Sequence, residues 1–239
     1  MKTEYDENYN INRMGFYSSI FLTVITLITF GFAITAIPIS GINCPDCLEY
    51  PYLDTLSQFP GDYLWMFPAT LLILTYLIFI VSVHSFASRK NKIFSRISLA
   101  FAIISSVVLL SCYFIQFSVI PASLMNGETE GIALLTQYNP HGVFIALEEL
   151  GYLMMSFSFL FIAPVFTNNN RVENSIRWIF IIAFILATIA FAFVTIKHGI
   201  VRKDRFEIMV ILINWLVLMT NGILTSIVFK RALKQIKSE

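Results

Sequence analysis

Two adjacent glutamates, Glu148 and Glu149, lie within the long apolar stretch 142–166 and are the residues best placed to do chemistry. A carboxylate in hydrocarbon costs roughly 2.5–3.5 kcal/mol on insertion scales, so it normally faces a protein interior, a partner or water. Two carboxyl groups this close could exchange protons, bind a cation, or act as acid and base. We therefore expect a functional site here. The alternative is a protonated glutamate that only hydrogen-bonds to a neighbouring helix.

Other polar residues are expected to gather around this pair. In a helix that turns about 100° per residue, His141, Glu148 and Tyr152 fall on one face. Glu148 and Tyr152 are four residues apart, which permits a hydrogen bond between phenol and carboxylate. Gln116 and Asn214, on other apolar stretches, are expected at a similar depth, as supporting ligands or as interhelical packing amides. The predicted ligand- or ion-binding residues are Glu148, Glu149, Tyr152, His141, Gln116 and Asn214.

A second candidate site is the Cys44-Pro-Asp-Cys47 sequence. This spacing is found in disulfides, in redox pairs and in half of a four-cysteine zinc site. The zinc interpretation lacks a second pair, since Cys112 is the one other thiol, so we predict no metal site. Cys44 and Cys47 resemble the reactive pair of membrane thiol oxidases that pass electrons to quinones, and that resemblance implies a redox role. We favour a structural disulfide or free thiols.

Composition and run length predict the elements that must position these residues. Hydrophobic residues make up 57% of the chain and charged residues 13%, with a mean hydropathy of +0.74. The apolar runs approach the roughly 20 residues needed to span a bilayer, which is too long for buried strands of about 4–8 residues. We predict an all-α polytopic integral membrane protein, a single domain over residues 1–239 built as a bundle of six transmembrane helices. The expected spans are Met14–Ile39, Tyr63–Ala87, Arg96–Ile120, His141–Phe166, Arg177–Ile196 and Glu207–Phe229.

The basic residues predict the orientation. Twelve of the sixteen Lys and Arg residues fall before the first span, in the second and fourth connections, and in the C-terminal tail. Because basic residues collect in cytoplasmic segments, both termini are predicted to be cytoplasmic. The other four, Lys197, Arg202, Lys203 and Arg205, lie in the fifth connection and fit this rule poorly. Richness in Ile, Phe, Asn and Lys is typical of AT-rich prokaryotic genomes, which favours a prokaryotic cytoplasmic membrane.

No motif assigns a reaction. The sequence has no GxSxG, HExxH, P-loop or GxGxxG motif, and no basic stripe interleaved with aromatic residues for nucleic acid. We therefore expect a small transporter-like or ligand-binding protein whose polar pocket opens outward and takes a small solute or ion from the bilayer's outer side. Its catalytic residues and cofactors stay unassigned. The alternatives are a thiol oxidoreductase, a lipid-modifying enzyme that uses the glutamates, or a non-catalytic subunit of a membrane complex.

Reporter fusions test the orientation. Fusions after residues 45, 92, 130, 170, 203 and 239 should report outside, inside, outside, inside, outside and inside, because the basic residues collect at the inner ends. An inside signal at position 203, with the others as stated, would contradict the last two spans.

Overall fold

The computed structural model describes residues 2–36, 48–166 and 170–238, and over these residues it is helical without strands. Six helices are long and apolar enough to cross a membrane, which confirms the predicted membrane class and the six spans. They are α1 (Lys2–Ala33), α2 (Met66–Phe86), α3 (Lys92–Ser118), α6 (Val143–Ile162), α7 (Arg171–His198) and α8 (Arg205–Ser238).

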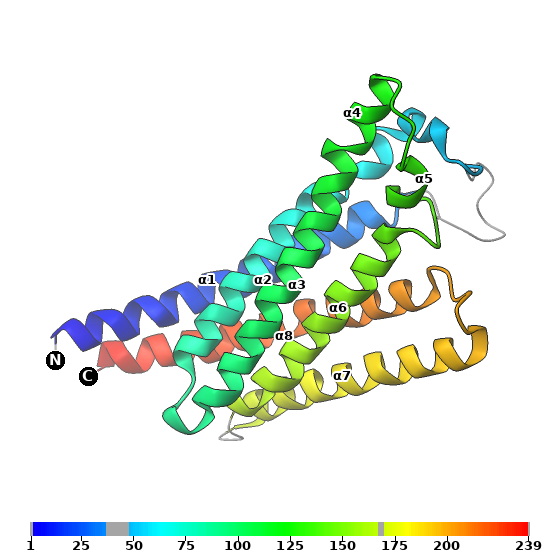
Figure 1. Cartoon of the computed structure of the whole chain (residues 1–239). Coiled ribbons are helices and arrows are strands. Elements are labelled where there is room, and N and C mark those ends of the chain that lie inside the picture. Colours follow the sequence, from blue (N-terminus) through cyan, green and yellow to red (C-terminus); the bar gives the residue numbers. More distant parts are fainter. Residues whose placement is uncertain (1, 37–47, 167–169, 239) are drawn as a thin grey trace.

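The connections contain short helical segments. Two short α-helices, α4 (Ile120–Met125) and α5 (Ile132–Leu135), lie between α3 and α6, and the 3-10 turns η1 (Leu53–Gln58) and η2 (Gly61–Tyr63) precede α2. The turns η3 (Arg89–Asn91) and η4 (Ala163–Val165) lie before α3 and after α6. Figure 1 shows both termini at one end of the bundle and α4 and α5 at the other. We call the end with α4 and α5 the loop end.

The six long helices form a closed ring in chain order. Each packs against its neighbours in the sequence, and α8 returns to pack along α1. Helix α6 also contacts α8 and α2 across the ring, so it is the helix with the most neighbours on different sides. Helix α6 therefore lies between α3 and α8 (Figure 1).

The helices extend beyond the apolar runs from which their bounds were predicted. Helix α1 already begins at Lys2 instead of Met14, and α7 begins at Arg171 instead of Arg177. Asn170 explains the second case, because its side-chain oxygen accepts hydrogen bonds from the backbone N–H groups of Val172 and Glu173 and so caps α7. Hydropathy marks where a helix is buried in lipid, whereas capping and backbone hydrogen bonding decide where it ends.

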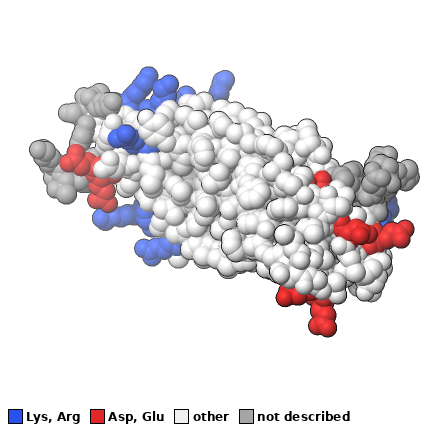
Figure 2. Space-filling model, turned by 90° about the horizontal axis from the view of Figure 1, so that it is seen from above, with Lys and Arg blue, Asp and Glu red and all other residues white. Residues whose placement is uncertain are grey.

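The outer surface is as apolar as a membrane protein requires. On α7 the large side chains of Ile185, Ile189 and Phe193 point outward, while the small residues Ala183 and Ala187 are buried against the bundle. This inverts the pattern of a soluble helix and allows close helix packing in lipid. In Figure 2, most Lys and Arg lie toward the end of the molecule with the termini, whereas Asp and Glu are seen at both ends.

Helices α1 and α8 pack closely at Gly222. A Cβ atom added there would lie 2.2 Å from Thr23 Oγ1 and 2.9 Å from the backbone oxygen of Ser19. The Thr23 hydroxyl also bonds across the crossing to the carbonyl of Met219, at 3.3 Å. The absence of a side chain at Gly222 therefore sets the distance between the first and last spans.

This crossing generates a stability prediction. Gly222→Ala should lower the melting temperature in detergent, because overpacking a close contact costs about 1–3 kcal/mol. The matched control is Gly31→Ala on α1, which has no atom within 4 Å of its added Cβ and should be neutral or slightly stabilising. Equal melting temperatures for the two variants would contradict the close crossing.

Candidate functional site

Glu148 is buried in the interior, 1% exposed, and receives a hydrogen bond at the end of a chain of donors. The Tyr113 hydroxyl on α3 donates to Glu148 Oε1 at 2.7 Å. The hydroxyls of Tyr113 and Tyr152 are 2.9 Å apart, and Trp215 Nε1 on α8 donates to the Tyr152 hydroxyl at 3.0 Å. Because each phenol carries one hydrogen, Tyr152 must donate to Tyr113. The chain Trp215, Tyr152, Tyr113 therefore points at Glu148 as its final acceptor.

This arrangement corrects the predicted direct contact between Glu148 and Tyr152. The two residues do lie on one face of α6, but the phenol of Tyr113 lies between them and bonds to both. The i,i+4 spacing correctly placed Glu148 and Tyr152 on one face of α6. The hydrogen-bond partner of Glu148 is Tyr113, because α3 packs against that face.

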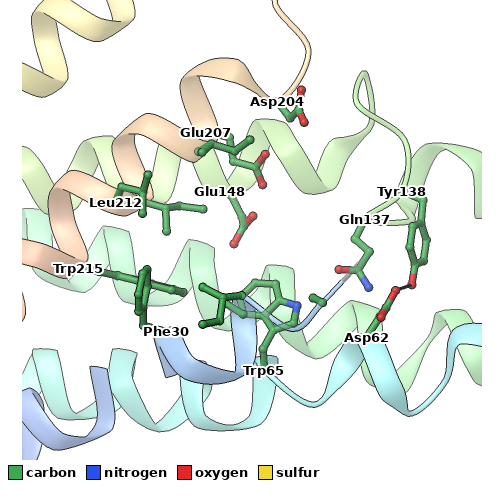
Figure 3. A pocket seen from close by; sticks show the side chains of 15 residues that line it. Phe30, Asp62, Trp65, Gln137, Tyr138, Glu148, Asp204, Glu207, Leu212 and Trp215 are labelled. Atoms are coloured by element: carbon green, nitrogen blue, oxygen red, sulfur yellow. Dashed lines mark hydrogen bonds between the residues drawn. The ribbon is translucent and has the colours of Figure 1, made fainter. Parts of the chain in front are cut away.

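A second carboxyl group, that of Glu207, faces Glu148 from the first turn of α8. The two carboxyl groups lie near each other at the wall of one cavity (Figure 3). Glu207 is 3% exposed, and its Oε2 atom is buried and receives no hydrogen bond from the described residues. An ionised carboxylate is only an acceptor, so a hydrogen bond between two carboxyl groups requires a proton on one of them. Neighbouring carboxyl groups from α6 and α8 thus line one cavity.

Glu207 was not among the predicted site residues, although its spacing carries a signal. It is the first residue of the last predicted span. It precedes Asn214 by seven residues, as Asn214 precedes Asn221, and this spacing places all three on one helix face. All three are buried in the structure.

The carboxyl pair lines a cavity of about 370 Å³ at the loop end, which we call the acidic pocket (Figure 3). Four of its lining residues are acidic: Asp62, Glu148, Asp204 and Glu207. Its remaining wall is mostly aromatic and aliphatic: Phe30, Ala33, Ile34, Ala36, Trp65, Gln137, Tyr138, Ile208, Ile211, Leu212 and Trp215. A concave, largely apolar site with a few polar groups is the usual form of a small-molecule site.

Asp62 and Tyr138 hold one side of the acidic pocket together. The Tyr138 hydroxyl donates to Asp62 Oδ2 at 2.8 Å, which joins the segment before α2 to the segment before α6. Burial, with the hydrogen bond to Asp62, raises the pKa of Tyr138. The phenol therefore stays protonated and remains a donor at neutral pH. This carboxylate is oriented by its neighbour before any ligand arrives.

Glu149 has a different partner from Glu148. Its carboxylate pairs with Arg202 in the connection between α7 and α8, where Arg202 Nε donates to Oε1 at 3.0 Å and Nη2 donates to Oε2. The guanidinium also lies over the Phe191 ring, 5.2 Å from its centroid. Arg202 of the fifth connection thus neutralises Glu149 of the fourth span. This pairing gives a reason for an arginine in a connection that fits the basic-residue rule poorly.

The other predicted site residues lie close to the pair but contact different groups. His141 precedes α6, is exposed, and lines a surface hollow with Glu149 and Arg202, so the shared face with Glu148 is not formed. Gln116 bonds to the backbone of the loop above it, donating to the Leu135 carbonyl at 2.7 Å and accepting from Gln137 N at 2.9 Å.

Asn214 lies deeper than the glutamates. Its amide donates to Ser156 Oγ on α6 at 3.0 Å and to the Val210 carbonyl at 2.7 Å. Of the predicted residues, Glu148 alone lines the acidic pocket, with Tyr152 directly behind it. Near the pocket, Gln116 binds the backbone at and just after the end of α5. Asn214 joins α8 to α6.

The cysteine pair lies outside the described residues, since Cys44 and Cys47 fall within 37–47. Cys112 is a buried free thiol whose Sγ donates to the Phe144 carbonyl at 3.6 Å. Among the described residues, no group of three or more His, Cys, Asp or Glu side chains has the geometry of a metal site.

No protein-family model, curated protein or solved structure matches this chain. The geometry and the charges of the acidic pocket are therefore the basis for inferring what the protein binds.

The Glu149–Arg202 pair generates a stability prediction. Arg202→Gln should destabilise the protein more than the double variant with Glu149→Gln, because the single change leaves a buried carboxylate unpaired. Arg202 is 31% exposed at its side chain. We therefore expect a coupling energy between the roughly 1 kcal/mol of exposed pairs and the roughly 3–5 kcal/mol lost on breaking buried ones.

The measurement is a double-mutant cycle of thermal or denaturant unfolding in detergent. Arg205→Gln, at an exposed arginine three residues away, is the control and should change stability little. Additive effects of Glu149→Gln and Arg202→Gln would show that the pair contributes nothing.

Proposed function

We propose that this multi-pass membrane protein binds a small organic cation in the acidic pocket and exchanges it for a proton, in the manner of a transporter-like binding site. The observation that carries the proposal is the carboxyl pair of Glu148 and Glu207 at the pocket wall. Two carboxyl groups in contact hold one proton and one negative charge. A cation that enters can replace the proton without changing the net charge of the site.

The hydrogen-bond chain supports a division of roles within the pair. Glu148 Oε1 accepts from Tyr113, whose own oxygen accepts from Tyr152, so three aligned donors stabilise a negative charge on Glu148. Glu207 has no such donor at Oε2 among the described residues. The proton is therefore assigned to Glu207. When a cation binds, this proton leaves to water and Glu207 becomes the second anionic ligand.

The walls of the acidic pocket favour an organic cation over a bare metal ion. Trp65, Trp215 and Phe30 present aromatic rings to the cavity. A cation over an aromatic face gains about 0.5–2 kcal/mol, most with tryptophan. A divalent ion would need several oxygen ligands at fixed short distances, and the described residues form no such cluster. A protonated amine is satisfied by a carboxylate and an aromatic ring.

The placement of the pocket at the loop end fits the predicted outer side, where the connections are acidic. Glu149 does not compete for the ligand, because Arg202 already neutralises it. The charged and titratable groups around Glu207 are Glu148, Glu149 with Arg202, Asp204, Asp62, Tyr138, Tyr113, Tyr152 and Cys112. The four charged side chains that line the pocket are acidic, which favours a ligand with net positive charge.

The test is calorimetric titration of the purified protein with butylamine, and with butanol as the neutral analogue. Butylamine should bind and release close to one proton, measured from the heats in buffers of different ionisation enthalpy, whereas butanol should not bind. Glu207→Gln should abolish the proton release. Glu207→Gln and Glu148→Gln should each weaken binding by about ten- to a hundredfold, the value of one charge-assisted hydrogen bond.

The pH dependence has a defined sign. The proton and the ammonium compete for Glu207, so affinity should rise with pH, by up to about tenfold per pH unit while the free protein holds the proton. Glu128→Gln, an exposed carboxyl of the same end outside the pocket, is the matched control. Both glutamine variants should keep the wild-type melting temperature or exceed it. Undiminished butylamine binding in the Glu148→Gln/Glu207→Gln double variant would overturn the proposal.

A further inference from the structure

We infer that the cation is an amphiphile with a single hydrocarbon chain, a protonated primary amine that enters the acidic pocket from the bilayer between α1 and α8. This inference rests on the proposed cation site and adds the substrate class and its route. Three observations carry it: the order of polarity along the pocket, the exposure of its apolar wall, and the sign of its charges.

The pocket changes from acidic to apolar along the axis of α8. Asp204 and Glu207 lie at the start of the helix, whereas Leu212 and Trp215 lie further in. Glu207 and Trp215 are eight positions apart, which is about 12 Å at the rise of an α-helix. Figure 3 shows Leu212, Trp215 and Phe30 together at one end, Asp62 and Tyr138 at the other, and Glu148 between them. An amine head and an alkyl chain match these two ends.

The order of polarity along the pocket matches the order along a lipid molecule in one leaflet of the bilayer. A membrane amphiphile places its charged head at the interface and its chain toward the bilayer centre. The acidic end of the pocket lies at the loop end of α8, and the apolar end lies deeper within the span. A single-chain amine could therefore move sideways from the leaflet into the pocket without turning over.

The apolar wall faces the surroundings of the bundle. Ile34, Ile208 and Leu212 line the pocket and are 68%, 50% and 41% exposed. Ile208 and Leu212 belong to a candidate membrane span, where lipid chains are the expected neighbours of exposed apolar side chains. The pocket is bounded on this side by the end of α1 and the start of α8. A cation without a hydrocarbon chain would gain no binding free energy from contact with this apolar wall.

The charges of the site select the head group. Asp62, Asp204 and the pair of Glu148 and Glu207 surround the place of the head. A phosphate would be repelled by these carboxylates, since like charges in a medium of low dielectric disfavour each other strongly. This argues against phospholipids, including zwitterionic ones, and in favour of an amine without a phosphate group.

The tryptophans provide a direct assay. Of the three tryptophans, Trp65 and Trp215 line the pocket, while Trp178 on α7 is exposed and remote from it. In a Trp178→Phe background, a nitroxide-labelled decylamine bound in the pocket should quench most of the fluorescence. Unlabelled butylamine, hexylamine, octylamine and decylamine then compete with it. Affinity should rise by about three- to fourfold per methylene, as expected for burial of each group, until the apolar end is filled.

A matched pair of variants separates pocket binding from partition into detergent. Leu212→Gln places an amide in the path of the chain and should weaken decylamine by about tenfold or more, because an apolar chain leaves that amide without a partner. Butylamine should lose less affinity than decylamine, because its shorter chain buries fewer methylene groups in the pocket. Leu216→Gln, one turn further along α8 and also exposed but outside the pocket, should leave both ligands unaffected. If Leu212→Gln does not fold, the chain-length series measured on the protein with Leu212 intact still tests the inference.

The outcomes distinguish the two proposals. Equal affinity for butylamine and decylamine, with proton release intact, would overturn the amphiphile and leave the cation site standing. Quenching by a nitroxide-labelled decanol as strong as by the amine would also overturn it, since charge would then play no part. Failure of every amine to bind or to release a proton would remove the cation site itself.

Discussion

A carboxyl group buried among transmembrane helices must find its hydrogen bonds within the protein, because lipid offers none. Glu148 accepts a hydrogen bond from Tyr113 on α3. Tyr113 in turn accepts from Tyr152 on α6, and Tyr152 accepts from Trp215 on α8, so the chain of donors draws on three helices. The chain of donors can form only if α3, α6 and α8 converge at one depth. The position of α6, in contact with helices on several sides of the ring, is therefore the arrangement on which the site depends.

The two adjacent glutamates have separate environments because neighbouring positions on a helix point about 100° apart. Glu149 faces the connection between α7 and α8 and is neutralised by Arg202, partly at the surface. Glu148 faces the interior and meets the carboxyl group of Glu207. One glutamate thus forms an ion pair that holds a loop, and the other forms a pair that can gain and lose a proton. Only the second lines the acidic pocket.

The acidic pocket combines two surfaces that are seldom adjacent in a membrane protein. Its carboxyl groups lie at the loop end, and its apolar wall reaches the lipid-facing side of α1 and α8. The close crossing of these helices at Gly222 lies further along α8 toward its C-terminus, so they stay in contact there while the pocket lies at their loop ends. The proposed ligand, an amine with a hydrocarbon chain, satisfies both surfaces at once.

The sequence by itself determined the membrane class and the six spans and identified the intramembrane glutamate pair, because run length and charge depend only on local composition. It also placed Tyr152 on the face of Glu148, which follows from helical periodicity. The tertiary structure decided the partners. Tyr113 and Glu207 come from α3 and α8, and nothing local to α6 determines which side chains those helices present. Gln116 turned to the loop backbone and Asn214 to Ser156, because the rotation of each helix about its axis is set by packing across the whole ring.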